Sequence, residues 1–321
     1  MVKSATKKQI PSMSLQVRWQ HIVMLVIIAL ALYVVVPQLS QFRSSFQALR
    51  EANLSLVVVA SLCIFTSVLS AAGAYRLLSF RKIPYRRIAL VQYSSMFINR
   101  LLPAGLGGAS LFVDFFYRHK HSFGKATAVV AVNSMLGLAA HWSLVAVCLL
   151  FFNLRLPEIN LPTFEVWLAI LLVLLAVGVV LSIVVRSVQS GKVGGTLRDM
   201  GRAFSQFRKR PQAISAALVF AFGNTLMHVL AMTFVITAFG QPFSFPTGLV
   251  VLTGGVFAAT ISPTPGGLLA SEAGITAMLV AYGLPVGPAL AVALTYRFVS
   301  YWLPILPGVV AFLYARNKRY V

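Results

Sequence analysis

The chain has 321 residues, of which 59% are hydrophobic and only 10% are charged. A soluble domain carries charge on about a quarter of its residues, so this composition excludes a soluble protein and indicates that lipid surrounds most of the chain. The net charge of +21 raises nucleic-acid binding as an alternative. The basic residues are dispersed among short loops, however, without a recognisable nucleic-acid-binding module.

Six stretches are apolar and long enough to be read as spans of a bilayer, which takes about 20 residues. In chain order they are His21 to Pro37, Leu54 to Leu78, Ala126 to Phe152, Val166 to Val185, Ala213 to Phe239 and Pro288 to Tyr314. The first is the shortest and follows a basic segment. Because no small-residue cleavage site follows it, we expect an uncleaved signal anchor rather than a signal peptide.

Two further apolar regions are interrupted by proline and glycine: Ile88 to Tyr117 and Pro246 to Tyr282. Each arm has about 15 residues, or roughly 22 Å of helix, which is less than the roughly 30 Å hydrocarbon core. We therefore expect two re-entrant helical hairpins; two pairs of short, tilted spans would give the same topology. The residues at the breaks are Pro103, Gly105, Gly107, Gly108, Pro263, Pro265, Gly266 and Gly267.

The basic residues predict the orientation. With the N-terminus inside, 22 of the 27 Lys and Arg fall in cytoplasmic segments and three (Arg43, Arg50 and Arg155) fall outside, as the positive-inside rule requires. We expect a multi-pass protein of the bacterial plasma (inner) membrane with both termini cytoplasmic. Its basic loops are expected to touch anionic lipid of the inner leaflet.

The order of elements repeats. Residues 1–160 and 161–321 each read as span, span, hairpin, span, and three spans per half invert the second half. The predicted fold is therefore an all-α polytopic membrane protein with six spanning helices, two hairpins and up to eight membrane segments. Inverted-repeat transporters place their sites near the midplane, where broken elements meet. A structural bundle without a transport role is the alternative.

Four ionisable residues lie at apparent membrane depth: Arg100, Asp114, Glu272 and Arg297. Each costs at least about 2.5 to 3.5 kcal/mol at the bilayer centre, so we expect partners and a binding role for Arg100, Glu272 and Arg297. The alternative is an Arg–Glu pair that only pins the hairpins together. Asp114 lies near the end of its arm and is either a site residue or a solvated interfacial one.

Several neutral polar residues are weaker candidates, since hydrogen bonds between helices explain such residues as often as ligand binding does. They are Asn99, Asn133, His141, Asn224 and His228. Sequence motifs for nucleotide binding, metal-dependent hydrolysis and nucleophilic catalysis are absent. We therefore expect no metal, no cofactor and no enzymatic activity.

Motifs in both halves resemble those of one family. They are Ser262-Pro-Thr-Pro-Gly-Gly-Leu-Leu-Ala-Ser-Glu272, Tyr282-Gly283 and Tyr296-Arg297, together with Asn99-Arg-Leu-Leu-Pro103 and Gly107-Gly108. The chain is similar over most of its length to flippase-like integral membrane proteins, which include the transmembrane region of lysylphosphatidylglycerol synthases. The resemblance implies translocation of a lipid with a polar headgroup, bound by Glu272 and Arg297 in the second half and Arg100 in the first.

Three functions follow as hypotheses. The leading one is a lipid translocator whose substrate is a phospholipid or glycolipid, with its site between the two broken hairpins. The second is an intramembrane transferase with Glu272 or Asp114 as general base. The third is a scaffold for a separate lipid-modifying enzyme.

Overall fold

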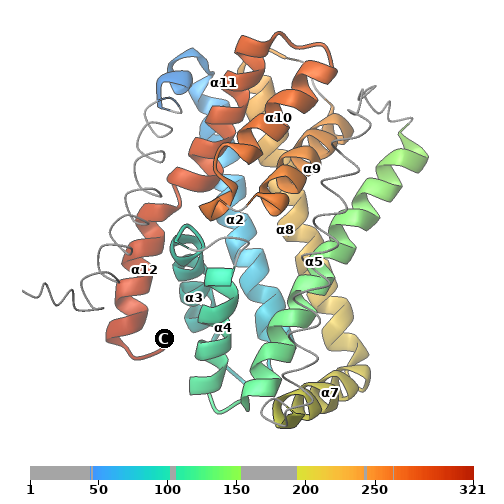
Figure 1. Ribbon diagram of the computed structural model, residues 1–321, viewed down its shortest axis with the longest axis vertical. Coiled ribbons are helices and arrows are strands. Elements are labelled where there is room, and N and C mark those ends of the chain that lie inside the picture. Colours follow the sequence, from blue (N-terminus) through green and yellow to red (C-terminus); the bar gives the residue numbers. More distant parts are fainter. Residues whose placement is uncertain (1–43, 45, 102–105, 153–193, 242–243, 263) are drawn as a thin grey trace, which may run out of the picture. The chain divides into compact units, whose positions relative to one another are not determined.

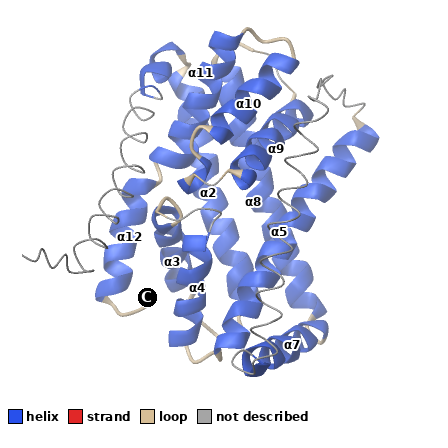
Figure 2. Ribbon diagram, in the orientation of Figure 1, coloured by secondary structure: helices blue, strands red, loops and turns tan. Residues whose placement is uncertain are grey.

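The computed structural model describes residues 44, 46–101, 106–152, 194–241, 244–262 and 264–321. These residues belong to one compact unit, Gln41–Val321, and within the described ranges the regular structure is helical throughout (Figures 1 and 2). The α-helices are α2 (Leu54–Leu78), α3 (Tyr85–Ile98), α4 (Leu106–Arg118), α5 (Phe123–Phe151), α7 (Gly194–Arg208), α8 (Pro211–Ala238), α9 (Phe245–Ile261), α10 (Ala270–Ala281), α11 (Val286–Arg297) and α12 (Ile305–Asn317).

Four helical segments are long and apolar enough to cross a membrane: α2, α5, α8 and the stretch Val286–Asn317, which contains α11 and α12. They coincide within a few residues with four of the predicted spans, and α2 has the predicted bounds. The other two, His21 to Pro37 and Val166 to Val185, lie outside the described residues. The prediction of a multi-pass membrane protein is thus confirmed, and the described residues are helical as predicted.

Each interrupted region forms two short helices. The first contains α3 and α4, with 14 and 13 residues, and the second contains α9 and α10, with 17 and 12. None of the four is long enough to cross the hydrocarbon core perpendicularly. Of the predicted break residues, Pro103, Gly105 and Pro263 lie outside the described part, whereas Gly107 and Gly108 open α4. Pro265, Gly266 and Gly267 form a 3₁₀ turn before α10.

Small residues let α9 and α10 approach closely. A Cβ at Gly274 would lie 2.7 Å from the Gly254 carbonyl oxygen and 2.7 Å from the Ala258 methyl group. Close contact of this kind drives helix association in membranes, where lipid is as apolar as the side chains and burial alone gives little. The two helices of the second broken region therefore pack directly against each other.

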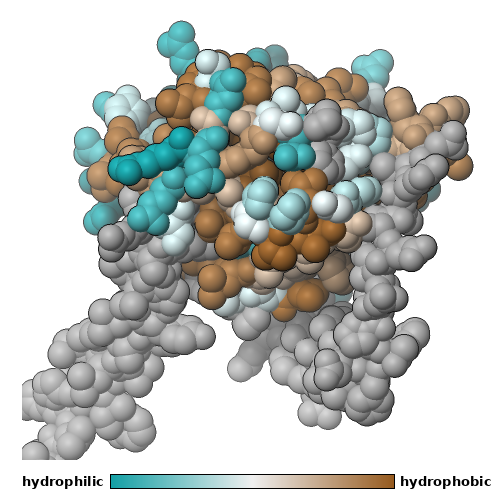
Figure 3. Space-filling view, turned by 90° about the horizontal axis from the view of Figure 1, so that it is seen from above, coloured by the Kyte–Doolittle hydropathy of each residue, from teal (hydrophilic) through white to brown (hydrophobic). Residues whose placement is uncertain are grey.

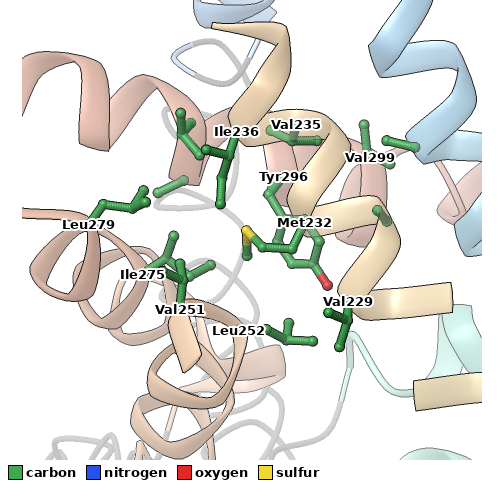
Figure 4. Packing of buried hydrophobic residues seen from close by; sticks show 14 of the residues in the cluster. Val229, Met232, Val235, Ile236, Val251, Leu252, Ile275, Leu279, Tyr296 and Val299 are labelled. Atoms are coloured by element: carbon green, nitrogen blue, oxygen red, sulfur yellow. The ribbon is translucent and has the colours of Figure 1, made fainter. Parts of the chain in front are cut away.

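Two clusters of buried hydrophobic residues stabilise the fold. One gathers side chains of α2, α8, α9, α10 and α11, and Figure 4 shows part of it converging around Met232 of α8. The other joins α2, α3, α4, α5, α7 and α8, with Tyr75 and Phe112 stacked at 3.9 Å between ring centroids. Each broken region thus packs against its own cluster.

Large hydrophobic side chains are also exposed on the surface. Leu150 and Phe151 of α5, Val219 of α8, and Leu306 and Val310 of α12 are between 68% and 77% exposed. Figure 3 shows hydrophobic residues reaching the surface between hydrophilic ones on one face of the molecule. Exposure on this scale suits helices that face lipid.

The last predicted span is interrupted in the structure. A π-helical turn, Phe298–Trp302, separates α11 from α12. In a continuous α-helix the Ser300 carbonyl would accept the N–H of residue 304, but Pro304 has no N–H. The proline accounts for the break and leaves the Ser300 carbonyl available to another part of the chain.

Candidate functional site

Glu272 and Arg297 form a buried ion pair. Arg297 Nε donates to Glu272 Oε1 at 2.5 Å, and the two residues are only 7% and 3% exposed. Glu272 lies in the first turn of α10 and Arg297 in the last turn of α11. A helix N-terminus stabilises a carboxylate and a C-terminus stabilises a cation, so both helices favour the charged pair. The predicted pairing is present.

The turn before α10 brings its backbone to this pair. Gly266 and Gly267 have φ of +63° and +66°, which glycine adopts without steric cost. The Gly266 carbonyl accepts from an Arg297 terminal nitrogen at 3.0 Å, and the Tyr301 ring lies against its Cα. Leu269, at the start of α10, also has a positive φ of 67°, a strained conformation of the kind found at functional sites.

Arg100 reaches the same place from the first half of the chain. Its guanidinium lies 4.1 Å from the centroid of the Tyr301 ring, and that of Arg297 lies 4.3 Å from the same centroid. One terminal nitrogen of Arg100 donates to the Ser300 carbonyl at 2.9 Å, the group that Pro304 leaves available. The three charged residues predicted as a site are therefore brought together around Tyr301. We call Arg100, Glu272, Arg297 and Tyr301 the Tyr301 cluster.

Asn99 connects the two helices of the first broken region. Its side-chain oxygen accepts the N–H of Gly108, the third residue of α4. Asn99 lies at the end of α3 and caps α4, because it accepts one of the N–H groups that have no partner within the first turn of α4. A Cβ at Gly107 would collide with the Ile98 carbonyl, and one at Gly108 with the Asn99 side chain. Both glycines therefore permit this cap.

The Tyr301 cluster carries an excess of positive charge, because it holds two guanidinium groups and one carboxylate. Among the described residues, three of its buried atoms have no hydrogen-bond partner: Arg100 Nε, Glu272 Oε2 and the Tyr301 hydroxyl. Buried polar atoms are normally satisfied. An anionic group with several oxygens, such as phosphate, would balance the charge and accept from Arg100.

Asp114 takes no part in this cluster in the structure. It forms an ion pair with Arg118, one turn further along α4, at 2.7 Å. Both side chains are nearly half exposed, where such a pair contributes little stability. The geometry corresponds to the interfacial alternative for this residue.

The weaker polar candidates mostly bridge helices. His141 of α5 bonds to Thr253 of α9 at 3.0 Å, and Asn133 of α5 lies near the Tyr75 hydroxyl of α2. His228 of α8 lies between Ser67 and the Tyr296 hydroxyl, 3.3 Å from each. Asn224 is half-buried one turn before it on α8. His228 thus contacts Tyr296, the residue that precedes Arg297 of the Tyr301 cluster.

Tyr301 and Ser300 were not predicted as site residues. A signal for Tyr301 was present, since it lies four residues after Arg297, the spacing that places side chains on one helix face. Pro304 likewise marks the freed carbonyl of Ser300.

Within the described residues no group of His, Cys, Asp and Glu is arranged to hold a metal ion.

The family of the chain follows from comparison with known proteins. A comparison with curated proteins finds no match. A family model described as the lysylphosphatidylglycerol synthase TM region matches residues 22–308, a range that includes both broken regions and all four residues of the Tyr301 cluster. The chain belongs to the lysylphosphatidylglycerol synthase TM-region family.

Proposed function

We propose that the protein translocates a lipid with a polar, phosphate-bearing headgroup across the bacterial inner membrane. The observation that carries this proposal is the Tyr301 cluster: two guanidinium groups and one carboxylate lie around one buried ring where the two broken regions approach each other. The family supports a lipid-related role. In this proposal the headgroup binds at the cluster while the acyl chains stay in the bilayer.

The two arginines of the cluster differ in their hydrogen-bond partners, and we expect them to have different roles. Arg297 is held by Glu272 and by the Gly266 carbonyl, so its position is largely predetermined. The Arg100 guanidinium has only the Ser300 carbonyl as a hydrogen-bond partner among the described residues, and its Nε is unpaired. Arg100 is therefore the residue we expect to bind the headgroup phosphate directly, since guanidinium groups bind phosphate through two parallel hydrogen bonds.

The proposal includes the predicted topology. The α3–α4 and α9–α10 pairs are re-entrant hairpins that enter from opposite sides, and both termini are cytoplasmic. In an inverted repeat the two broken elements come close at mid-membrane, and the contacts of Arg100 with residues 300 and 301 are consistent with this. Irregular backbone at that depth is tolerated where protein buries it or where it lines a wet cavity.

A headgroup-accessibility assay in proteoliposomes tests the proposal. Reconstituted protein is given a fluorescent phospholipid, and the fraction reached by a membrane-impermeant quencher is followed over time. We expect movement with the wild type. Arg100→Gln should slow it between tenfold and a hundredfold, because a charged hydrogen bond contributes about 1.5 to 3 kcal/mol. Glu272→Gln and Arg297→Ala should abolish it.

Two variants control for the loss of charge. Arg118→Gln removes an exposed cation from the Asp114 pair and should leave movement unchanged, whereas Arg100→Lys keeps the charge and loses the planar fork. Full activity in folded Arg100→Gln would overturn the assignment of the site. Absence of movement by folded wild type, combined with conversion of a lipid by the purified protein, would indicate the transferase. Absence of both would leave the scaffold.

A further inference from the structure

A second basic site lies at the end of α2, apart from the Tyr301 cluster. A cavity of about 1110 Å³ opens between the last turns of α2, the segment that joins α2 to α3, and the first turns of α8. Its lining includes Arg76, Arg81, Lys82 and Arg210. The positive-inside rule places this end of α2 in the cytoplasm.

The charge of this cavity is one-sided. It is lined by four cationic side chains and by neither Asp nor Glu. Within the described parts of the chain, none of these four cations takes part in a salt bridge. Like charges this close repel one another unless an anion lies between them. The cavity therefore has the electrostatics of an anion site.

Arg210 gives the cavity a fixed base. Its guanidinium donates to the carbonyls of Ser79 and Leu77 at 3.3 and 3.4 Å, and it lies 5.5 Å from the centroid of the Phe80 ring. These contacts attach the start of α8 to the end of α2. Arg76, Arg81 and Lys82 are exposed side chains around this base, so they are available to a ligand.

The lining of the cavity also includes apolar residues. Phe220 of α8 lines the cavity with its ring against Gly73 of α2, and is 40% exposed. Leu69 of α2 and Val219 of α8, nearby in the chain, are 41% and 69% exposed. A ligand bound here would have its polar end among four cations and an apolar part beside exposed hydrophobic side chains.

We propose that this cavity binds the phosphate headgroup of an anionic phospholipid of the cytoplasmic leaflet, with an acyl chain along Phe220. Basic pockets between membrane helices bind lipids of this class. A free phosphate ion shares the charge chemistry but has no apolar part to contact those apolar residues. The inference stands on residues outside the Tyr301 cluster, so it is independent of the proposed translocation.

Native mass spectrometry of the detergent-purified full chain tests this site. The protein is titrated with phosphatidylglycerol, with phosphatidylcholine and, separately, with inorganic phosphate. We expect wild type to bind phosphatidylglycerol at least tenfold more tightly than phosphatidylcholine. A triple variant, Arg76→Gln, Arg81→Gln and Lys82→Gln, should lose on the order of a hundredfold in affinity, at about 1 kcal/mol for each basic residue.

Two further variants separate this site from general surface charge. The triple variant Arg316→Gln, Lys318→Gln and Arg319→Gln removes equal charge from exposed residues on the same predicted side and should bind as wild type does. Ala213→Trp fills the cavity without changing charge and should also weaken binding. Equal losses in both triple variants, or binding of inorganic phosphate as tight as that of phosphatidylglycerol, would overturn the proposal.

Discussion

The two broken regions differ in how they are held together. At the second, a buried ion pair, two glycines with positive φ and close packing of α9 on α10 determine the geometry. At the first, α3 and α4 share buried hydrophobic packing, and the Asn99 side chain caps α4. The adjacent Arg100 has no carboxylate partner among the described residues. The second region is therefore a preformed support, and the first presents the available charge.

The largest effect should come from separating the ion pair. Glu272→Gln or Arg297→Met leaves a buried charge without its partner, which costs about 3 to 5 kcal/mol. We expect that loss in the free energy of unfolding, measured by denaturant titration in mixed micelles. The double variant should recover most of it, because no buried charge is then unpaired. Arg118→Met at the exposed pair should change it by less than about 1 kcal/mol.

A smaller loss should follow from Gly266→Ala. The alanine would have to keep a φ of +63°, and its methyl group would collide with the Tyr301 ring. We expect about 2 kcal/mol of destabilisation, measured in the same unfolding assay. Gly137→Ala is the matched control, since a Cβ there meets nothing within 4 Å and φ is not positive. It should stabilise α5 by up to about 1 kcal/mol. Equal effects of the two changes would contradict this account of the turn.

Asn99→Ala tests the support of the first region and should cost about 1 kcal/mol through loss of the α4 cap. It should also slow lipid movement, because Arg100 follows directly. Asn53→Ala is the control: Asn53 caps α2 by accepting the Ser55 N–H at an exposed position, where water replaces the lost bond. A greater loss in the free energy of unfolding from Asn53→Ala than from Asn99→Ala would contradict the importance of the cap between α3 and α4.

The smallest effect concerns His121, in the segment between α4 and α5. Its Nε2 accepts the Phe80 N–H at 3.3 Å and its Nδ1 faces the Phe116 carbonyl at 3.1 Å. Burial lowers the pKa of His121. Hydrogen bonds to the backbone of His119 and Phe116 oppose this shift, and the nearby charges of Arg81 and His119 add to it. The neutral form therefore stabilises the fold above about pH 6.5, the ordinary value, and this contribution is lost as the pH falls below that value.

Thermal unfolding between pH 8 and pH 5 measures this contribution. His121→Gln, which cannot be protonated, should show a flatter decline than wild type over that range. Identical profiles would show that His121 does not contribute to the pH dependence.

Several elements could be predicted because they depend on local sequence. The bounds of α2 follow from an uninterrupted apolar run of bilayer length, and both interrupted regions follow from proline and glycine. The need for partners for Glu272 and Arg297 follows from the cost of charge in lipid. The sequence allows two roles for Asp114 because it lies near the end of an apolar arm, and only the structure shows its exposed pair with Arg118.

The sequence by itself determined the membrane class, four described spans and the set of charges that must be satisfied within the bilayer, because hydropathy and the cost of burial are properties of each segment alone. Only the tertiary structure decided that Arg100 lies on Tyr301 and bonds to the Ser300 carbonyl, a partner 200 residues away in the chain. Contacts between distant segments depend on how the helices pack, and Pro304 matters to Arg100 only once that packing brings the two together.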